Sequence, residues 1–130
     1  MVIKGSNLYF ANEDYDYMKG NIDRSLLMKN SFLITCQQCV EKYLKALIAE
    51  KLQEKVITHN LNVLSSKLRQ VYPEIVKYDN ILRFLKDCYY DRRCDNEFYI
   101  ELSDSEFIEK RTEILELIEW LRAEANKDAN

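Results

Sequence analysis

Apolar side chains recur along this chain at steps of three and four residues, the spacing that places them on one face of an α-helix. The longest run is expected to form a helix that begins near Asn30 or Ser31 and ends near Lys51. Its apolar stripe consists of Phe32, Cys36, Cys39, Val40, Tyr43, Leu44, Leu47 and Ile48. Glu41 and Lys45 flank the stripe, and an i,i+4 ion pair between them is expected to contribute roughly a few tenths of a kcal/mol.

The same spacing predicts one helix before this run and a short helix after it. The first is expected from about Leu8 to Lys19, whereas residues 22–29 fit either a loop or an extension of a neighbouring helix. Thr58 or Asn60 can cap the short helix, because a side-chain oxygen there accepts a hydrogen bond from an unpaired backbone amide. Its buried face is expected to consist of Leu61, Leu64, Leu68 and Val71. Pro73 ends it, since the proline ring disfavours helical geometry in the preceding residue.

A fourth helix is expected from Ile75 or Asp79 to Tyr90. Its inward positions are Ile81, Leu82, Leu85, Cys88 and Tyr89. The segment Asp91–Leu102 is polar at its centre and breaks the periodicity, so an irregular loop is expected there.

The last helix begins with the spacing of a capping box. The Ser103 hydroxyl and the Glu106 carboxylate would each accept a hydrogen bond from a terminal backbone amide. This helix is expected to end near Ala123. Its buried positions are expected to be Phe107, Ile114, Leu115, Ile118 and Leu121.

The composition favours a few long helices over a sheet. Only two glycines and one proline occur among 130 residues, whereas sheet proteins use both freely in their turns. A chain of this length can bury one hydrophobic core and is too short for two ordinary domains. The sequence therefore predicts an all-α fold, an antiparallel up-and-down bundle of four to five helices, in a single domain spanning residues 1–130.

Charge and hydropathy narrow the choice of partners and location. The net charge of −3 argues against broad, nonspecific attraction to nucleic acid or to anionic membranes, and neither DNA nor a membrane is an expected partner. No apolar run reaches membrane-spanning length, and the first residues lack the basic and apolar blocks of a signal peptide. We therefore expect a cytoplasmic protein. In that reducing compartment Cys36, Cys39, Cys88 and Cys94 are expected to be free thiols.

The chain offers little for metal or nucleophilic chemistry. A di-metal bundle needs Glu-x-x-His pairs, but the only histidine, His59, follows Val56 at that spacing. Cys36-x-x-Cys39 lacks a second pair, so a structural role is favoured over a zinc site. Neither a nucleophile elbow nor a glycine-rich phosphate loop is present. We expect no metal and no cofactor. For His59, a capping or packing role is favoured over ligand binding, and both stay open.

One polar cluster at the exit of the fourth helix could bind a phosphate. Arg92 and Arg93 follow two tyrosines and precede Tyr99. Guanidinium groups offer bidentate donors to phosphate, and tyrosine rings can stack on bases. In the alternative, the arginines pair with Asp91, Asp95 or the acidic last helix. The residues alone do not separate these two interpretations.

Four motifs in this order resemble the HEPN family, the higher eukaryote and prokaryote nucleotide-binding helical domain. The first is Ala11-x-x-Asp14-Tyr15 and the second is Gln37-x-x-x-Glu41-Lys42-x-x-Lys45-Ala46-Leu47. The third is Thr58-His59-Asn60-Leu61, and the fourth is the tyrosine–arginine exit of the fourth helix. The resemblance implies an up-and-down bundle that forms homodimers. It also implies a minimal nucleotidyltransferase partner, in arrangements resembling toxin–antitoxin modules.

The resemblance also implies a candidate catalytic set. HEPN ribonucleases carry Arg-x4-His-x-Tyr, which places Arg92 at the arginine, Tyr99 at the tyrosine and Glu97 at the histidine. Glutamate is ionised at neutral pH and cannot readily reprotonate a leaving group. We therefore expect a nucleotide- or RNA-binding protein that is noncatalytic or weakly active, with Arg92, Arg93 and His59 as ligand-binding residues. The alternatives are a metal-independent HEPN endoribonuclease toxin that uses Glu97, and a purely structural dimerisation module.

Overall fold

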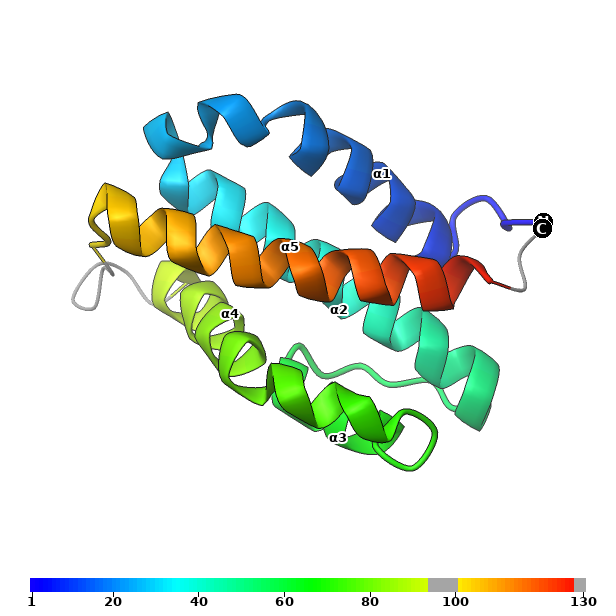
Figure 1. The fold of residues 1–130 in the computed structure, drawn as a ribbon. Coiled ribbons are helices and arrows are strands. Elements are labelled where there is room, and N and C mark those ends of the chain that lie inside the picture. Colours follow the sequence, from blue (N-terminus) through cyan, green and yellow to red (C-terminus); the bar gives the residue numbers. More distant parts are fainter. Residues whose placement is uncertain (94–100, 128–130) are drawn as a thin grey trace.

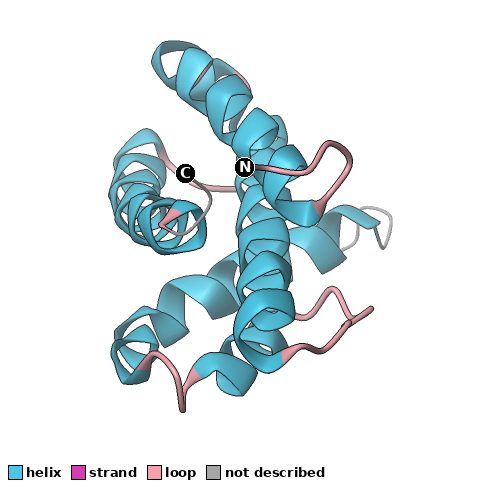
Figure 2. Ribbon diagram, turned by 90° about the vertical axis from the view of Figure 1, so that its right-hand side faces the viewer, coloured by secondary structure: helices cyan, strands magenta, loops and turns pink. Residues whose placement is uncertain are grey.

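The computed structural model describes residues 1–93 and 101–127, and for residues 89–93 it describes the backbone alone. Its elements in chain order are α1 (Asn7–Gly20), η1 (Ile22–Leu27), α2 (Lys29–Leu52), α3 (Leu61–Leu68), η2 (Pro73–Tyr78), α4 (Asp79–Arg93) and α5 (Asp104–Asn126), where η marks a short 3-10 helix. Over these residues the chain contains helices and loops but no strand (Figure 2). The predicted all-α bundle is thus confirmed.

Helix α2 is the central element of the bundle. It packs against α1, α3, α4 and α5, and Figure 1 shows α1 on one side of α5 with α3 and α4 on the other. Its buried positions therefore extend beyond the predicted stripe to Leu33, Gln37 and Glu41. A single amphipathic face was too narrow a prediction, because a helix surrounded by four others buries most of its circumference.

The core holds the apolar positions that the helical spacing selected. Tyr43, Leu44, Leu47 and Ile48 of α2 are fully buried, as is Phe107 of α5. The Phe32 and Phe107 rings meet edge to face with centroids 5.9 Å apart, which joins the first turns of α2 and α5. Each fully buried side chain of this size contributes about 1.5–3 kcal/mol relative to exposure.

Two predicted helix starts are confirmed in atomic detail. Asn60 caps α3, since its Oδ1 accepts hydrogen bonds from the backbone amides of Asn62 and Val63 at 3.0 and 3.2 Å. At α5 the Ser103 hydroxyl accepts from the Glu106 amide at 3.2 Å, and the Glu106 carboxylate accepts from the Ser103 amide at 3.0 Å. These hydrogen bonds to the ionised carboxylate lower the pKa of Glu106.

Several predicted boundaries were wrong by a few residues. Helix α3 ends at Leu68, so Val71 is 38% exposed and not part of a buried face, and a 3-10 helix follows from Pro73. Helix α4 continues to Arg93, into the expected loop. Leu115 of α5 is partly buried, not fully buried as expected. Such ends depend on tertiary packing, which local periodicity does not encode.

None of the helices in the described ranges is long and apolar enough to cross a membrane.

Candidate functional site

The predicted phosphate site lies at the C-terminal end of α4. The backbone of Arg92 and Arg93 forms the last residues of this helix. Their side chains lie outside the described residues, as do Glu97 and Tyr99. The grouping of Arg92, Arg93, Glu97 and Tyr99 therefore stays a prediction from the sequence.

His59, the other predicted ligand-binding residue, lies in the loop between α2 and α3. A turn holds it there, because the Thr58 hydroxyl accepts a hydrogen bond from the Asn60 amide at 3.1 Å. The His59 side chain is 49% exposed, and its Nδ1 lies 2.9 Å from Oε2 of Glu41 in the middle of α2. His59 thus ties the α2–α3 loop to α2, while the neighbouring Asn60 is the cap.

Glu41 is the centre of this polar network. Its Oε1 accepts a hydrogen bond from Gln37 Nε2 at 3.0 Å, and its Oε2 accepts one from Lys45 Nζ at 3.0 Å in addition to the contact with His59. The predicted i,i+4 ion pair between Glu41 and Lys45 is therefore confirmed, and it is largely buried, since only 8% of Glu41 is exposed. A carboxylate buried this deeply needs several donors to offset the cost of desolvation.

The electrostatics of the network favour an ionised carboxylate. Burial alone would raise the pKa of Glu41, but hydrogen bonds from His59, Lys45 and Gln37 outweigh it and lower that pKa. An ionised carboxylate can only accept hydrogen bonds, so Nδ1 of His59 carries a proton in this contact. The stability that these contacts give is present above the pKa of an unfolded glutamate and is lost as the pH falls through the lowered pKa of Glu41.

Lys42 of the same motif and its neighbour Tyr43 tie α2 to α1. Lys42 Nζ lies 2.7 Å from Oδ2 of Asp14, and the Tyr43 hydroxyl donates a hydrogen bond to Oδ1 of Asn12 at 2.7 Å. Glu41, Lys42 and Tyr43 are consecutive, yet the first contacts the α2–α3 loop and the other two contact α1. This stretch of α2 therefore holds both α1 and the α2–α3 loop.

The cysteines behave as buried apolar side chains. Cys36, Cys39 and Cys88 are buried, and Cys94 lies outside the described residues. Burial raises the pKa values of the Cys36 and Cys39 thiols, which keeps them protonated and unreactive at neutral pH. Over residues 1–93 and 101–127 no group of three or more His, Cys, Asp or Glu side chains is placed to hold a metal ion.

A groove of about 910 Å³ lies beside Lys45, between the N-terminal residues, the second half of α2 and the loop that follows it. Its floor is apolar. Among the charged side chains at its rim, Lys45 pairs with Glu41, Glu50 with Lys51, and Glu54 with Lys67. Lys55 also lines the groove, and it pairs with no acidic side chain among the described residues.

The sequence contained a signal for the Glu41 network, but the apolar periodicity of the same helix drew attention away from its polar residues. Gln37, Glu41 and Lys45 follow one another at four-residue steps, so they line one face of α2. Polar residues at that spacing inside a helix with buried neighbours indicate a buried network. Only the return of the chain to His59 supplies its fourth member.

Residues 8–124 match the family model of the HEPN domain. No curated protein and no solved structure matches the chain. The matched range begins in α1 and ends in α5, so it contains the Glu41 network, the Asp14–Lys42 contact and the α4 exit. The chain therefore belongs to the HEPN domain family, as the order of its motifs predicted.

Proposed function

We propose that this HEPN protein binds a nucleotide or RNA and is noncatalytic or only weakly active. Membership of a family that is generally nucleotide- or RNA-related supports the binding part. The proposed contact site is the exit of α4, with Arg92 and Arg93 as phosphate ligands. Arginine suits this role because it stays charged and donates two parallel hydrogen bonds.

The observation that carries the noncatalytic part concerns the single histidine of the chain. His59 Nδ1 contacts the buried carboxylate of Glu41, on the loop between α2 and α3. The ribonuclease pattern would need an imidazole in the segment after α4, where this chain has Glu97. The histidine therefore serves the packing of α2, which supports binding without efficient proton transfer.

Binding and cleavage can be measured in one experiment. The protein and its Arg92→Ala variant would be titrated into fluorescently labelled RNA in the presence of a metal chelator. We expect anisotropy to rise with the wild-type protein and to rise less with the variant, while the RNA stays intact. Arg24→Ala provides a matched control, because Arg24 is an exposed arginine on η1.

Two results would contradict this proposal. Rapid cleavage that disappears in Arg92→Ala and in Glu97→Gln would establish the endoribonuclease alternative. No anisotropy change with RNA, together with no rise in melting temperature with any nucleotide, would leave a structural module. The melting test is sensitive because a ligand that binds only the native state stabilises it by mass action.

We further propose that the protein acts as a homodimer and pairs with a minimal nucleotidyltransferase. Family membership supports both assignments. Light scattering after size-exclusion chromatography would give the mass of the assembly. A monomer at micromolar concentration would contradict the dimer, and failure to co-purify with a nucleotidyltransferase encoded beside it would contradict the pairing.

A further inference from the structure

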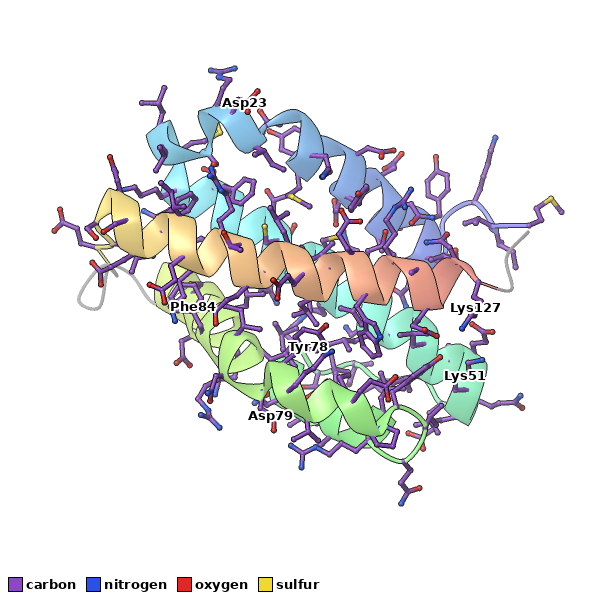
Figure 3. All side chains as sticks on the ribbon, viewed as in Figure 1. Asp23, Lys51, Tyr78, Asp79, Phe84 and Lys127 are labelled. Atoms are coloured by element: carbon purple, nitrogen blue, oxygen red, sulfur yellow. The ribbon has the colours of Figure 1, made fainter. Side chains whose placement is uncertain are left out.

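A row of aromatic rings with lysines above them lies between α5 and the η2–α4 segment. The stacking surface, as we name it, consists of Lys77, Tyr78, Phe84, Lys110 and Trp120. Lys77 Nζ lies 5.1 Å from the centre of the Tyr78 ring, and Lys110 Nζ lies 5.2 Å from the centre of the Phe84 ring. Tyr78 also contacts Trp120, with ring centres 5.7 Å apart. Figure 3 shows Tyr78 and Phe84 along the same side of α5.

The antiparallel course of α4 and α5 explains this arrangement (Figure 1). Tyr78, the last residue of η2 before α4, meets Trp120 late in α5, whereas Phe84 in α4 meets Lys110 early in α5. The six residues from Tyr78 to Phe84 correspond to roughly 9 Å of helix. The rings are packed against the core yet only partly buried, so each keeps an accessible part. The result is two ring–lysine sites in a row.

The lysines of the stacking surface differ from other lysines that lie over rings. Lys42 lies 5.7 Å from the Phe10 ring centre but pairs with Asp14 at 2.7 Å. Lys19 lies 5.9 Å from the Tyr15 ring centre and pairs with Glu119 at 3.6 Å.

On the stacking surface the lysines are less compensated. Lys77 forms no ion pair within the part of the chain that the structure describes, and neither does Arg83 nearby on α4. Lys110 has only a long contact of 3.9 Å with Glu113. Positive charge is therefore available at the stacking surface. Around Phe10 and Tyr15, by contrast, the lysine charges are neutralised by acidic side chains.

We propose that the stacking surface binds single-stranded RNA, with bases stacked on Tyr78, Phe84 or Trp120 and phosphates beside Lys77 and Lys110. The inference rests on the proposed function and extends the RNA path from the α4 exit along α4 and α5. Aromatic rings beside cations are the usual means of holding single strands, because every base has a face that can stack. Carboxylates such as Glu113 border the surface, so stacking contributes more than charge.

The chain carries an internal probe for this surface. Trp120 is its only tryptophan, so emission excited selectively at tryptophan, and not at the nine tyrosines, reports on the stacking surface alone. A single-stranded oligonucleotide of mixed sequence would be titrated while tryptophan emission and the anisotropy of a label on the RNA are recorded. We expect both signals to follow one curve, with tryptophan emission quenched as bases stack.

Two variants test the rings and the lysines separately. Phe84→Leu keeps apolar volume but removes the ring, and we expect about fivefold weaker binding, near the low end for one stacked base. The double variant Lys77→Gln, Lys110→Gln removes two phosphate partners, so the slope of log affinity against log salt should fall by about 1.4. Phe10→Leu and Lys19→Gln are the matched controls, and we expect neither to change binding.

The outcomes separate this inference from the proposed function. RNA binding by anisotropy without tryptophan quenching, and with unchanged affinity in both variants, would overturn the stacking surface and leave the α4 exit as the site. Equal affinity for double-stranded RNA would also overturn it, because paired bases offer no free faces. No RNA binding at all would overturn the proposed function first. Circular dichroism of each variant confirms that the fold is retained.

Discussion

The two sides of α5 pack against the rest of the bundle through different chemistry. Towards α1 the contacts are polar: the Tyr15 hydroxyl lies 2.9 and 2.7 Å from the carboxylate oxygens of Glu119. Asn12 and Asn126 exchange side-chain hydrogen bonds at 2.9 and 3.1 Å. Towards η2 and α4 the contacts are aromatic, with the Trp120 ring 5.5 Å from Tyr72 and 5.7 Å from Tyr78. We name these the polar seam and the aromatic seam.

The comparison shows how neighbouring positions on one helix acquire opposite roles. Glu119 and Trp120 are consecutive, yet one belongs to the polar seam and the other to the aromatic seam. In the polar seam Glu119 accepts a hydrogen bond from Tyr15 and pairs with Lys19, while Arg122 lies 4.4 Å from the Tyr15 ring centre. The acidic group of the polar seam thus has both a hydrogen-bond donor and a cation as partners, whereas Lys77 of the aromatic seam has a ring contact without an ion pair among the described residues.

The largest effect is expected from removing the centre of the aromatic seam. Trp120→Ala should lower the free energy of unfolding by about 2–3 kcal/mol, less than a fully buried tryptophan because the ring is partly exposed. Urea unfolding followed by circular dichroism measures this without the tryptophan signal. Ile108→Ala, at a 40% exposed position of α5, should change it by less than about 0.5 kcal/mol. If Trp120→Ala lowered the free energy of unfolding by as little as Ile108→Ala, the aromatic rings would not hold α5 in place.

A pair of tyrosine variants separates the seams directly. Tyr15→Phe leaves the Glu119 carboxylate without its hydroxyl donor, so we expect a loss of about 1 kcal/mol in the free energy of unfolding. The Tyr78 hydroxyl donates no hydrogen bond to any residue that the structure describes. Tyr78→Phe should therefore cost less than about 0.5 kcal/mol. Similar losses in the two variants would remove the distinction between a polar and an aromatic seam.

Alkaline pH should weaken the polar seam selectively. Burial, followed by the hydrogen bond to Glu119 and the charge of that carboxylate, raises the pKa of Tyr15 above its ordinary value of 10.0. A raised pKa means that the contact stabilises the fold below pH 10.0 and is lost as the pH rises through the higher folded-state pKa. The stability difference between wild type and Tyr15→Phe should therefore shrink above that pH in urea titrations. A constant difference would contradict the role of the proton.

The smallest effects concern the lysines over the rings. Lys19→Gln should cost about 0.5 kcal/mol, because a half-exposed ion pair with Glu119 and a ring contact are both lost. Lys77→Gln should cost less in stability, since only a ring contact is lost. Thermal melts at low and high salt distinguish them, because screening reduces the Lys19 effect more. A larger loss of stability in Lys77→Gln than in Lys19→Gln would indicate that the lysine of the aromatic seam is a structural residue.

Local signals were enough to predict most of the fold. The stripe from Phe32 to Ile48, the Asn60 cap and the Ser103–Glu106 capping box all depend on residues within a few positions of one another. Such features follow from helix geometry and backbone hydrogen bonding, which the sequence encodes directly. The HEPN motifs could be recognised in the sequence for the same reason, because each consists of residues within a few positions of one another. Arg92, Glu97 and Tyr99 remain assigned by sequence alone.

Contacts between distant residues required the tertiary structure. Glu41 was expected beside the apolar stripe and paired with Lys45, but only the return of the chain 18 residues later brings His59 to its carboxylate. Likewise, Trp120 of α5 meets Tyr72 and Tyr78, at the two ends of η2, only because the fold brings these distant segments together. The sequence by itself determined which faces of each helix are apolar and where most helices begin. Tertiary packing decided which polar groups are buried, which are paired and which keep their charge. The reason is that burial and pairing depend on the residues that surround a group in space, and these are often distant in the sequence.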